Sequence, residues 1–479
     1  MIREIFRDQF TDVRRREWLP TLLMSAFFFL IIGIFWVLKP LKRGVIINYF
    51  GDAPVSFFGL TFGGAEAEQI GKFLNVIAAY LVVIAFTWLA VRVARHWMVA
   101  IFAAGCAAAF VSYAYLLQGP FGQLTAWSFY VFGDMFNTVM VVLFWAFTDD
   151  LWTADQAKRT YGLVGLGGTL GGFLGASVVS STVEESGRSP LLLWCVVPMV
   201  LVVVIAFLVQ RLRGPDGVRV RTGAAASWTD TPAAVEGAKL VFASPYLLAI
   251  AGIIGTYELV SNIVDFQLAS TVEAMIPDDL GKDAFFALVG QITGVGSIVV
   301  QLLLTSFVMK RWGLKVALSF LPVAVAVSSL GFLILPTLAL AAAMSASDNT
   351  LNYSINQSAR EALYTPTDPD TTYKAKAFID MFVQRFGKVV SVVLNLALVA
   401  LLAGNVRWLS MVTLAMAVVW FLLVRYVGVC FSQAEREAEK REPGAAGPQP
   451  LPAPPGGPRP PFMGRPPARP QRARRGDLK

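Results

Sequence analysis

The chain has little charge for its length and few of the residue types that build catalytic centres. Of its 479 residues 15% are charged and 56% are hydrophobic, and it has one histidine, His96, and three cysteines. Soluble globular proteins carry charge on about a quarter of their residues, so the composition excludes that class. A single histidine excludes histidine-based metal centres and catalytic triads. The cysteines lie in apolar stretches without the spacing of a metal site or a disulfide framework.

Apolar runs of about 20 residues recur along the chain, and a helix of that length spans the hydrocarbon core of a bilayer. The sequence therefore predicts an all-α polytopic membrane protein with about twelve transmembrane helices. The first run lacks a small-residue cleavage site, which favours a retained helix over a signal peptide. We expect spans at residues 19–38, 72–91, 97–117, 124–147, 161–183, 190–209, 245–276, 283–308, 314–335, 337–357, 376–403 and 407–430.

The distribution of Lys and Arg sets the expected orientation. If the N-terminus is cytoplasmic, most loop cations fall inside, and the short outer loops beyond the second helix hold only Arg188, Lys282 and Arg407. This asymmetry follows the positive-inside rule and predicts cytoplasmic termini for a protein of the cell (inner) membrane. The net charge of +8 is then a topological signal. We expect the lipid bilayer, and no nucleic acid, as a partner.

The chain divides into two halves that share short similar segments at matching positions. Asn137-Thr138 and Asn349-Thr350 stand at matching places, and a similar Leu-aromatic-Thr segment follows each pair. This similarity predicts two pseudo-symmetric six-helix bundles, the major-facilitator architecture. After Glu442, twelve of the 26 prolines interleave with Gly and Arg, which predicts disorder. The expected parts are a cytoplasmic N-terminal segment (1–19), two bundles (20–209 and 241–430), a cytoplasmic linker (210–240) and a disordered cytoplasmic tail (431–479).

Polar side chains lie inside several predicted helices, where they are unfavourable unless they face a cavity or a partner. In the seventh helix Glu258, Asn262 and Asp265 fall on one face. Comparable polar residues occur in the tenth, eleventh and fourth helices: Asn349, Asn352, Asn356, Gln384, Lys388, Ser391, Asn395, Asp134 and Asn137. Polar faces on four helices of one bundle indicate an aqueous pathway through its centre.

Cations in or beside this pathway favour an anionic substrate, because Lys and Arg both bind phosphate. The candidate substrate-binding residues are Lys42, Arg43, Arg385 and Lys388 for phosphates, and Asn349, Asn352 and Asn356 for the polar remainder of the solute. The candidates for charge coupling are Asp134, Glu258, Asn262 and Asp265. An alternative is that the cations neutralise Glu258 or Asp265.

The segment from Gly162 to Gly175, GLVGLGGTLGGFLG, is only superficially like a phosphate-binding loop, because it has no Gly-Lys-Ser/Thr ending. Gly167, Gly171 and Gly175 follow one another at four-residue spacing. Small residues at that spacing allow membrane helices to approach closely. The segment therefore predicts helix packing.

Two segments carry a resemblance to a known family. They are Tyr353 to Val390, YSINQSAREALYTPTDPDTTYKAKAFIDMFVQRFGKVV, and Phe144 to Leu174, FWAFTDDLWTADQAKRTYGLVGLGGTLGGFL. The chain resembles the nucleotide transporter family, the ATP/ADP translocases of plastids and obligate intracellular bacteria. By this resemblance Lys42 matches an essential lysine, Asp265 matches a glutamate, and Arg385 with Lys388 matches a cationic pair.

The resemblance implies a secondary transporter that exchanges nucleotides such as ATP and ADP, without catalytic residues, metal or cofactor. Two alternatives stay open. One is a proton-coupled carrier or exporter of another anionic metabolite, a lipid or a peptide, with Asp265 or Glu258 as the protonation site. The other is a non-transporting membrane scaffold that acts through its basic tail. A membrane enzyme is disfavoured because no cluster offers a nucleophile with its base.

Overall fold

The structure is a computed structural model. It describes residues 17–57, 60–90, 92–152, 154–213, 231–367, 369–402 and 404–441. The chain separates into two units, Met1–Glu435 and Arg436–Lys479. The first unit contains nearly all of the helices. Most of the predicted tail, and the N-terminal segment up to residue 16, lie outside the described residues.

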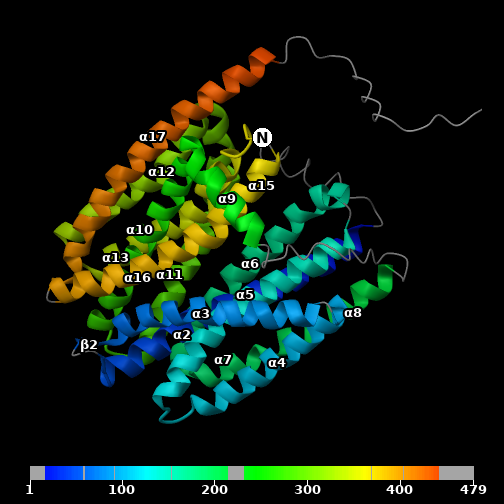
Figure 1. Ribbon diagram of the computed structural model, residues 1–479. Helices are drawn as coiled ribbons and strands as arrows, with labels where there is room; N and C mark the ends of the chain where they lie inside the picture. Colours follow the sequence, from blue (N-terminus) through cyan, green and yellow to red (C-terminus); the bar gives the residue numbers. More distant parts are fainter. Residues whose placement is uncertain are drawn as a thin grey trace, which may run out of the picture. The chain divides into compact units, whose positions relative to one another are not determined.

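The N-terminal half consists of the helices α2 to α8 (Figure 1). They are α2 (Trp18–Asp52), α3 (Gly64–Ala90), α4 (Arg95–Leu116), α5 (Gln123–Leu151), α6 (Ala154–Ser186), α7 (Arg188–Trp194) and α8 (Val196–Arg213). A short antiparallel hairpin, β1 (Val55–Phe57) and β2 (Leu60–Phe62), joins α2 to α3. The sequence analysis did not predict this hairpin.

The C-terminal half is also helical, but π-helical segments interrupt several of its helices. Its elements are α9 (Thr231–Ala243), α10 (Pro245–Met275), α11 (Asp279–Val299), η2 (Val300–Thr305), α12 (Ser306–Ile334), α13 (Leu338–Leu351), η3 (Asn352–Asn356), α14 (Gln357–Ala362), α15 (Pro369–Phe378), η4 (Ile379–Val383), α16 (Gln384–Leu401), η5 (Val406–Trp408) and α17 (Leu409–Arg441). The π-helical segments are η2, η3 and η4, whereas η5 is a short 3₁₀ helix.

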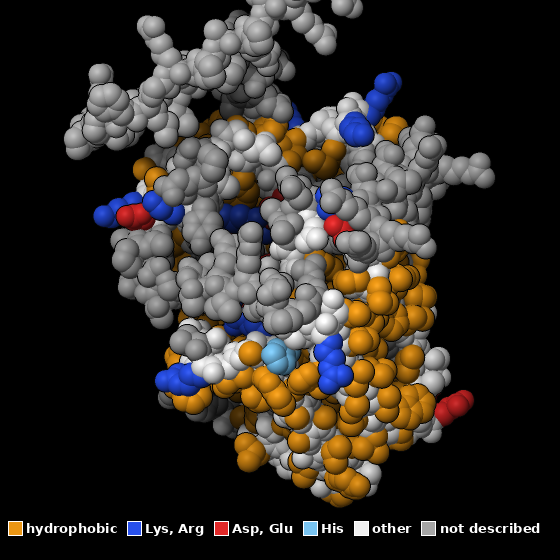
Figure 2. All heavy atoms as spheres, turned by 90° about the vertical axis from the view of Figure 1, so that its right-hand side faces the viewer, with side chains coloured by type: hydrophobic (Ala, Val, Ile, Leu, Met, Phe, Trp, Pro, Cys, Tyr) orange, Lys and Arg blue, Asp and Glu red, His pale blue; other side chains and the backbone are white. Residues whose placement is uncertain are grey.

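Within the described residues, ten helical stretches are long and apolar enough to cross a membrane. One of them, residues 279–334, contains a break at Gly313, whose φ of 81° is left-handed backbone that favours glycine. That stretch therefore covers the predicted eighth and ninth spans. Large apolar side chains such as Leu81 and Ile84 are exposed, and hydrophobic side chains cover the lower part of one face (Figure 2). The chain is a helical multi-pass membrane protein, and the count of twelve spans stays a prediction.

The first helix is longer than predicted. The predicted span ends at residue 38, because Lys39 and Pro40 interrupt the apolar run. In the structure α2 continues through Pro40 to Asp52. The next helix likewise begins at Gly64 and not at residue 72. The predicted spans were limited to the apolar runs. The additional polar turns at the end of α2 and the start of α3 face the interior of the protein and not lipid. Helical backbone can therefore continue where hydropathy falls.

The glycine-rich stretch of α6 packs directly against α2, as its spacing predicted. A Cβ atom at Gly171 would lie 2.2 Å from the carbonyl oxygen of Phe29, and one at Gly175 would lie 2.2 Å from that of Gly33. Gly167 approaches Ser25 in the same way. The prediction of close helix packing is confirmed.

Two predicted boundaries differ from the structure. The last part of the predicted linker, from Thr231 onward, is the helix α9, which packs against α15. The predicted tail begins inside α17, which continues to Arg441. In both places the charged residues lower the hydropathy without ending the helix. Residues 214–230 and 442–479 lie outside the described residues.

Candidate functional site

Three cations lie close together on one stretch of α2, because residues at i, i+3 and i+4 share a helix face. They are Lys39, Lys42 and Arg43. Lys42 is buried and pairs with Asp134 of α5, and its ammonium group lies 4.3 Å from the centre of the Tyr130 ring. The amide of Asn75 on α3 donates to the other carboxylate oxygen of Asp134. Lys42 is therefore held in an ion pair within the N-terminal half.

Arg43 is also buried and is bound to two carboxylates. Its Nε lies 2.7 Å from Glu68 Oε1 on α3, and its Nη1 lies 2.8 Å from Asp265 Oδ1 on α10. The second oxygen of Asp265 is 2.5 Å from Lys72 Nζ, also on α3. Asp265 thus joins two cations of the N-terminal half to a helix of the C-terminal half. Of the candidate cations, Arg43 thus neutralises Asp265, as the alternative interpretation of the sequence allowed.

Other polar contacts join the two halves at the end of the bundle where α2 and α10 end. Both carboxylate oxygens of Glu273 accept from the backbone N–H groups of Gly64 and Ala65, at 2.8 and 2.7 Å. Arg188 pairs with the buried Asp283 at 2.5 Å. At the opposite end, ion pairs among the described residues join side chains of the same half. The halves are therefore bonded to each other at one end, called the closed end below.

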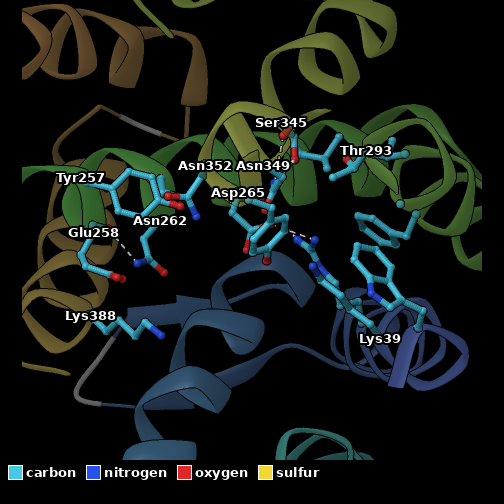
Figure 3. A pocket seen from close by; sticks show the side chains of 18 of the residues that line it. Lys39, Tyr257, Glu258, Asn262, Asp265, Thr293, Ser345, Asn349, Asn352 and Lys388 are labelled. Atoms are coloured by element: carbon cyan, nitrogen blue, oxygen red, sulfur yellow. Dashed lines mark hydrogen bonds and ion pairs between the residues drawn. The ribbon is translucent and has the colours of Figure 1, made fainter. Parts of the chain in front are cut away.

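Two adjoining cavities of about 360 and 370 Å³ lie between the halves. The first is lined chiefly by α10, α2 and α11, with further residues from α13, η3, α14 and α16, and the second chiefly by α2, α3 and α5. Lys39, Arg43, Asn262, Asp265 and Lys388 line both. Figure 3 shows Lys388 beside Glu258 and Asn262 at one side of the first cavity, and Lys39 at the other. Charged side chains are also visible set back in a hollow in Figure 2.

The predicted site residues converge on these cavities, with one exception. Asn349, Asn352 and Glu258 line the first cavity, and Lys42, Asp134 and Arg385 line the second. Asn356 lines neither cavity, because the π-helical turn η3 rotates it into the interior, where it donates to Asn352 Oδ1 at 3.1 Å. Its predicted contact with the solute is therefore not supported by its position.

Four cavity cations have no ion pair among the described residues. Lys39 lies 4.5 Å from the centre of the Trp36 ring, Arg385 lies 5.2 Å from that of Tyr80, and Arg360 lies 5.9 Å from that of Tyr257. The fourth is Lys388. Altogether seven Lys or Arg and four Asp or Glu side chains line the two cavities, which leaves three positive charges in excess when all are ionised. The site is built to receive an anion.

Sequence reasoning left several lining residues out of the predicted site. Glu68, Lys72 and Asn75 are spaced i, i+4, i+7, the pattern that singled out Glu258 and its neighbours. They were missed because the second helix was expected to begin at residue 72. Lys39 and Arg360 also line the cavities and were not among the candidate residues. Asn137 and Asn349, the pair that suggested the internal repeat, line the second and the first cavity respectively.

Within the described part of the chain, no three His, Cys, Asp or Glu side chains are arranged to hold a metal ion.

Solved structures with the same fold are transporters of other solutes. The nucleoside transporter NupG aligns with a TM-score of 0.58 at 15% identity, over 87% of this chain and 99% of that one. A POT family peptide transporter aligns with a TM-score of 0.55 at 12% identity, over 88% and 97%. These likenesses establish a major-facilitator-like fold.

Curated relatives are nucleotide carriers. ADP,ATP carrier protein 1 of Arabidopsis thaliana chloroplasts is 25% identical over 363 residues, which are 67% of this chain and 58% of that one. ADP,ATP carrier protein 1 of Chlamydia muridarum is 25% identical over 371 residues, 68% of this chain and 70% of that one. The match therefore spans less than two thirds of the chloroplast carrier's length.

The model of one protein family covers more than half of the sequence. The TLC ATP/ADP transporter model matches residues 114–348 and 333–431, which run from the end of α4 into α17. This range includes the residues of α10, α13 and α16 that line the first cavity. The chain belongs to the TLC ATP/ADP transporter family.

Proposed function

We propose that the chain is a secondary transporter that exchanges anionic nucleotides such as ATP and ADP by alternating access of its two halves. The observation that carries the proposal is the excess of three positive charges in the central cavities. A nucleotide di- or triphosphate supplies a comparable negative charge. The named activity of the curated carriers agrees with this reading. No catalytic step is needed, so the proposal is for a transporter and not an enzyme.

The unpaired cations are the first phosphate ligands in this proposal. Arg385, Lys388 and Lys39 reach the cavities without an acidic partner among the described residues. Lys42 and Arg43 already have carboxylate partners, so they bind phosphate only if it displaces those carboxylates. The amides of Asn349 and Asn352 then face the rest of the nucleotide.

Exchange follows from the position of Asp265 between the halves. The closed end opens only when the bonds from Asp265 to Arg43 and Lys72 break. An arriving phosphate offers these cations a replacement partner, whereas an empty cavity leaves them uncompensated and buried, which is strongly unfavourable. Nucleotide binding therefore promotes the change of conformation, whereas the empty carrier remains in the conformation it has. This difference makes transport an exchange. The carboxylates of Asp134 and Glu258 offset part of the remaining positive charge of the cavities.

We further propose that the protein lies in the cell (inner) membrane with both termini in the cytoplasm. The loop cations support this orientation by the positive-inside rule. The closed end then faces away from the cytoplasm. The described conformation would be the one that receives cytoplasmic nucleotide.

The test is uptake of labelled ATP into proteoliposomes loaded with ADP, compared with empty vesicles. Exchange of ATP against ADP moves about one net charge, worth about 2.3 kcal/mol per 100 mV, so an imposed potential should change the rate. Lys388→Ala should abolish uptake, and removal of residues 442–479 should leave it unchanged. Failure of every nucleotide to be transported, with Lys388→Ala binding nucleotide like the unmodified protein, would contradict the proposal. If only the tail deletion abolished function, the scaffold alternative would hold.

One observation favours a second candidate, a proton-coupled carrier of another anion. The carboxylate of Glu258 lines the first cavity and has no ion pair among the described residues. An unpaired carboxylate in a membrane protein is a natural proton carrier. In that case a proton gradient would drive uptake without a counter-nucleotide. Glu258→Gln or Asp265→Asn would uncouple the flux from the gradient.

A further inference from the structure

One aromatic side chain in the first cavity is largely exposed. Tyr353 lines the cavity and is 53% exposed, and among the described residues it has no ring partner and no hydrogen bond. Its neighbour Tyr257 is buried instead, with its ring centre 5.8 Å from that of Trp420. A ring that is exposed in the cavity wall offers a flat apolar face to a ligand.

The backbone around Tyr353 is unusual in a way that affects its direction. The residue lies in η3 (Asn352–Asn356), a π-helical turn inside the continuous helix from α13 to α14. Such turns are rare and occur frequently at functional sites, because the wider turn changes where its side chains point. Here the change turns Asn356 inward and leaves Tyr353 in the cavity wall.

Hydrogen-bonding groups flank the exposed ring. Asn349 lies one turn before Tyr353. Its Nδ2 donates to the Ser345 carbonyl at 2.9 Å and to Ser345 Oγ at 3.5 Å, while its Oδ1 has no partner among the described residues. Gln357 lies one turn after it and also lines the cavity. The free Oδ1 of Asn349 is an acceptor, which suits the exocyclic amino group at the edge of a nucleobase such as adenine.

We propose that Tyr353 is the stacking platform for the nucleobase and that Asn349 reads the edge of that base. The phosphate chain then extends toward Lys388, which lines the same cavity. Aromatic side chains stack on any base through its π-face, so the platform supplies affinity and the amide supplies selectivity. The inference rests on the proposed function and adds the subsite that distinguishes a nucleotide from a plain polyphosphate.

The experiment compares two probes, ATP and inorganic tripolyphosphate, by calorimetric binding to the purified full-length protein. Tyr353→Ala should weaken ATP about tenfold, the usual effect of removing one stacked ring, and leave tripolyphosphate unchanged. Tyr353→Phe should bind ATP like the unmodified protein, since it keeps the ring. Tyr115→Ala is the matched control, because Tyr115 is an exposed tyrosine of α4 that lines neither cavity.

Retained binding of tripolyphosphate shows that a variant is folded. If Tyr353→Ala does not fold, Tyr353→Leu keeps the apolar volume without the ring and should show the same selective loss. Equal losses of ATP and tripolyphosphate, or no loss of ATP, would overturn the inference while the transport proposal stands. Absence of binding of either probe to the unmodified protein would instead remove the proposed function, and the subsite with it.

Discussion

The two halves hold their polar residues in different ways. In the N-terminal half, Lys42, Arg43 and Lys72 each have a carboxylate partner, whereas Lys39 has none among the described residues, and the described helices carry no π-helical segment. In the C-terminal half, Arg360 and Lys388 have no ion pair among the described residues, and π-helical turns interrupt the helices. The charges of the paired residues are already compensated in the described conformation. The unpaired ones are available to a ligand.

The largest expected effect is a loss of stability when one partner of a buried ion pair is removed. Arg43→Ala should lower the free energy of unfolding by about 3–5 kcal/mol, because it leaves the buried carboxylate of Glu68 without a partner. Thermal unfolding in detergent measures it. The double variant with Glu68→Gln should recover part of the loss. A loss in the single variant no greater than that of an exposed pair would contradict this prediction.

The second prediction concerns the unpaired side. Lys388→Ala should leave thermal unfolding nearly unchanged but weaken nucleotide binding by about 1.5–3 kcal/mol, the usual contribution of a hydrogen bond to a charged group. Titration of ATP into the purified protein gives this value. If the variant lost stability and kept its affinity, the contrast between the halves would be wrong.

A smaller effect is expected for Glu258→Gln. This carboxylate repels an anionic ligand in the first cavity, so its removal should tighten ATP binding by about 1 kcal/mol, a Coulomb energy typical of partly solvated groups. Competition binding of ATP against ADP measures the change, which should be larger for the more highly charged ATP. Weaker binding of both would assign Glu258 to the ligand contacts.

The smallest effect sets the baseline for the comparison. Lys376 and Glu361 form an ion pair at 2.5 Å whose side chains are 36% and 49% exposed. Lys376→Ala should therefore change the free energy of unfolding by about 1 kcal/mol or less. The same unfolding assay, run beside Arg43→Ala, separates exposed from buried pairs. A loss as large as that of Arg43→Ala would remove the distinction.

Much of the fold could be predicted because membrane helices are long and their apolar content is read directly from the sequence. The errors fall where charge lowers hydropathy inside a helix, as in the turn of α2 that carries Lys39 and Lys42 and the first turns of α3. The polar stripes located a part of the cavity wall. Asn356 was misplaced because ideal helical spacing cannot foresee the π-helical turn η3.

The sequence by itself determined the class of the protein, the close packing of the glycine-rich helix and several of the charged and amide side chains that face the cavities. It did so because each of these depends on local composition or on helical periodicity. Only the tertiary structure decided which charges are already neutralised. Ion pairs such as Arg43 with Asp265 join side chains 222 residues apart, and that partnership depends on how the halves pack. The same packing left Lys388 and Tyr353 open to a ligand.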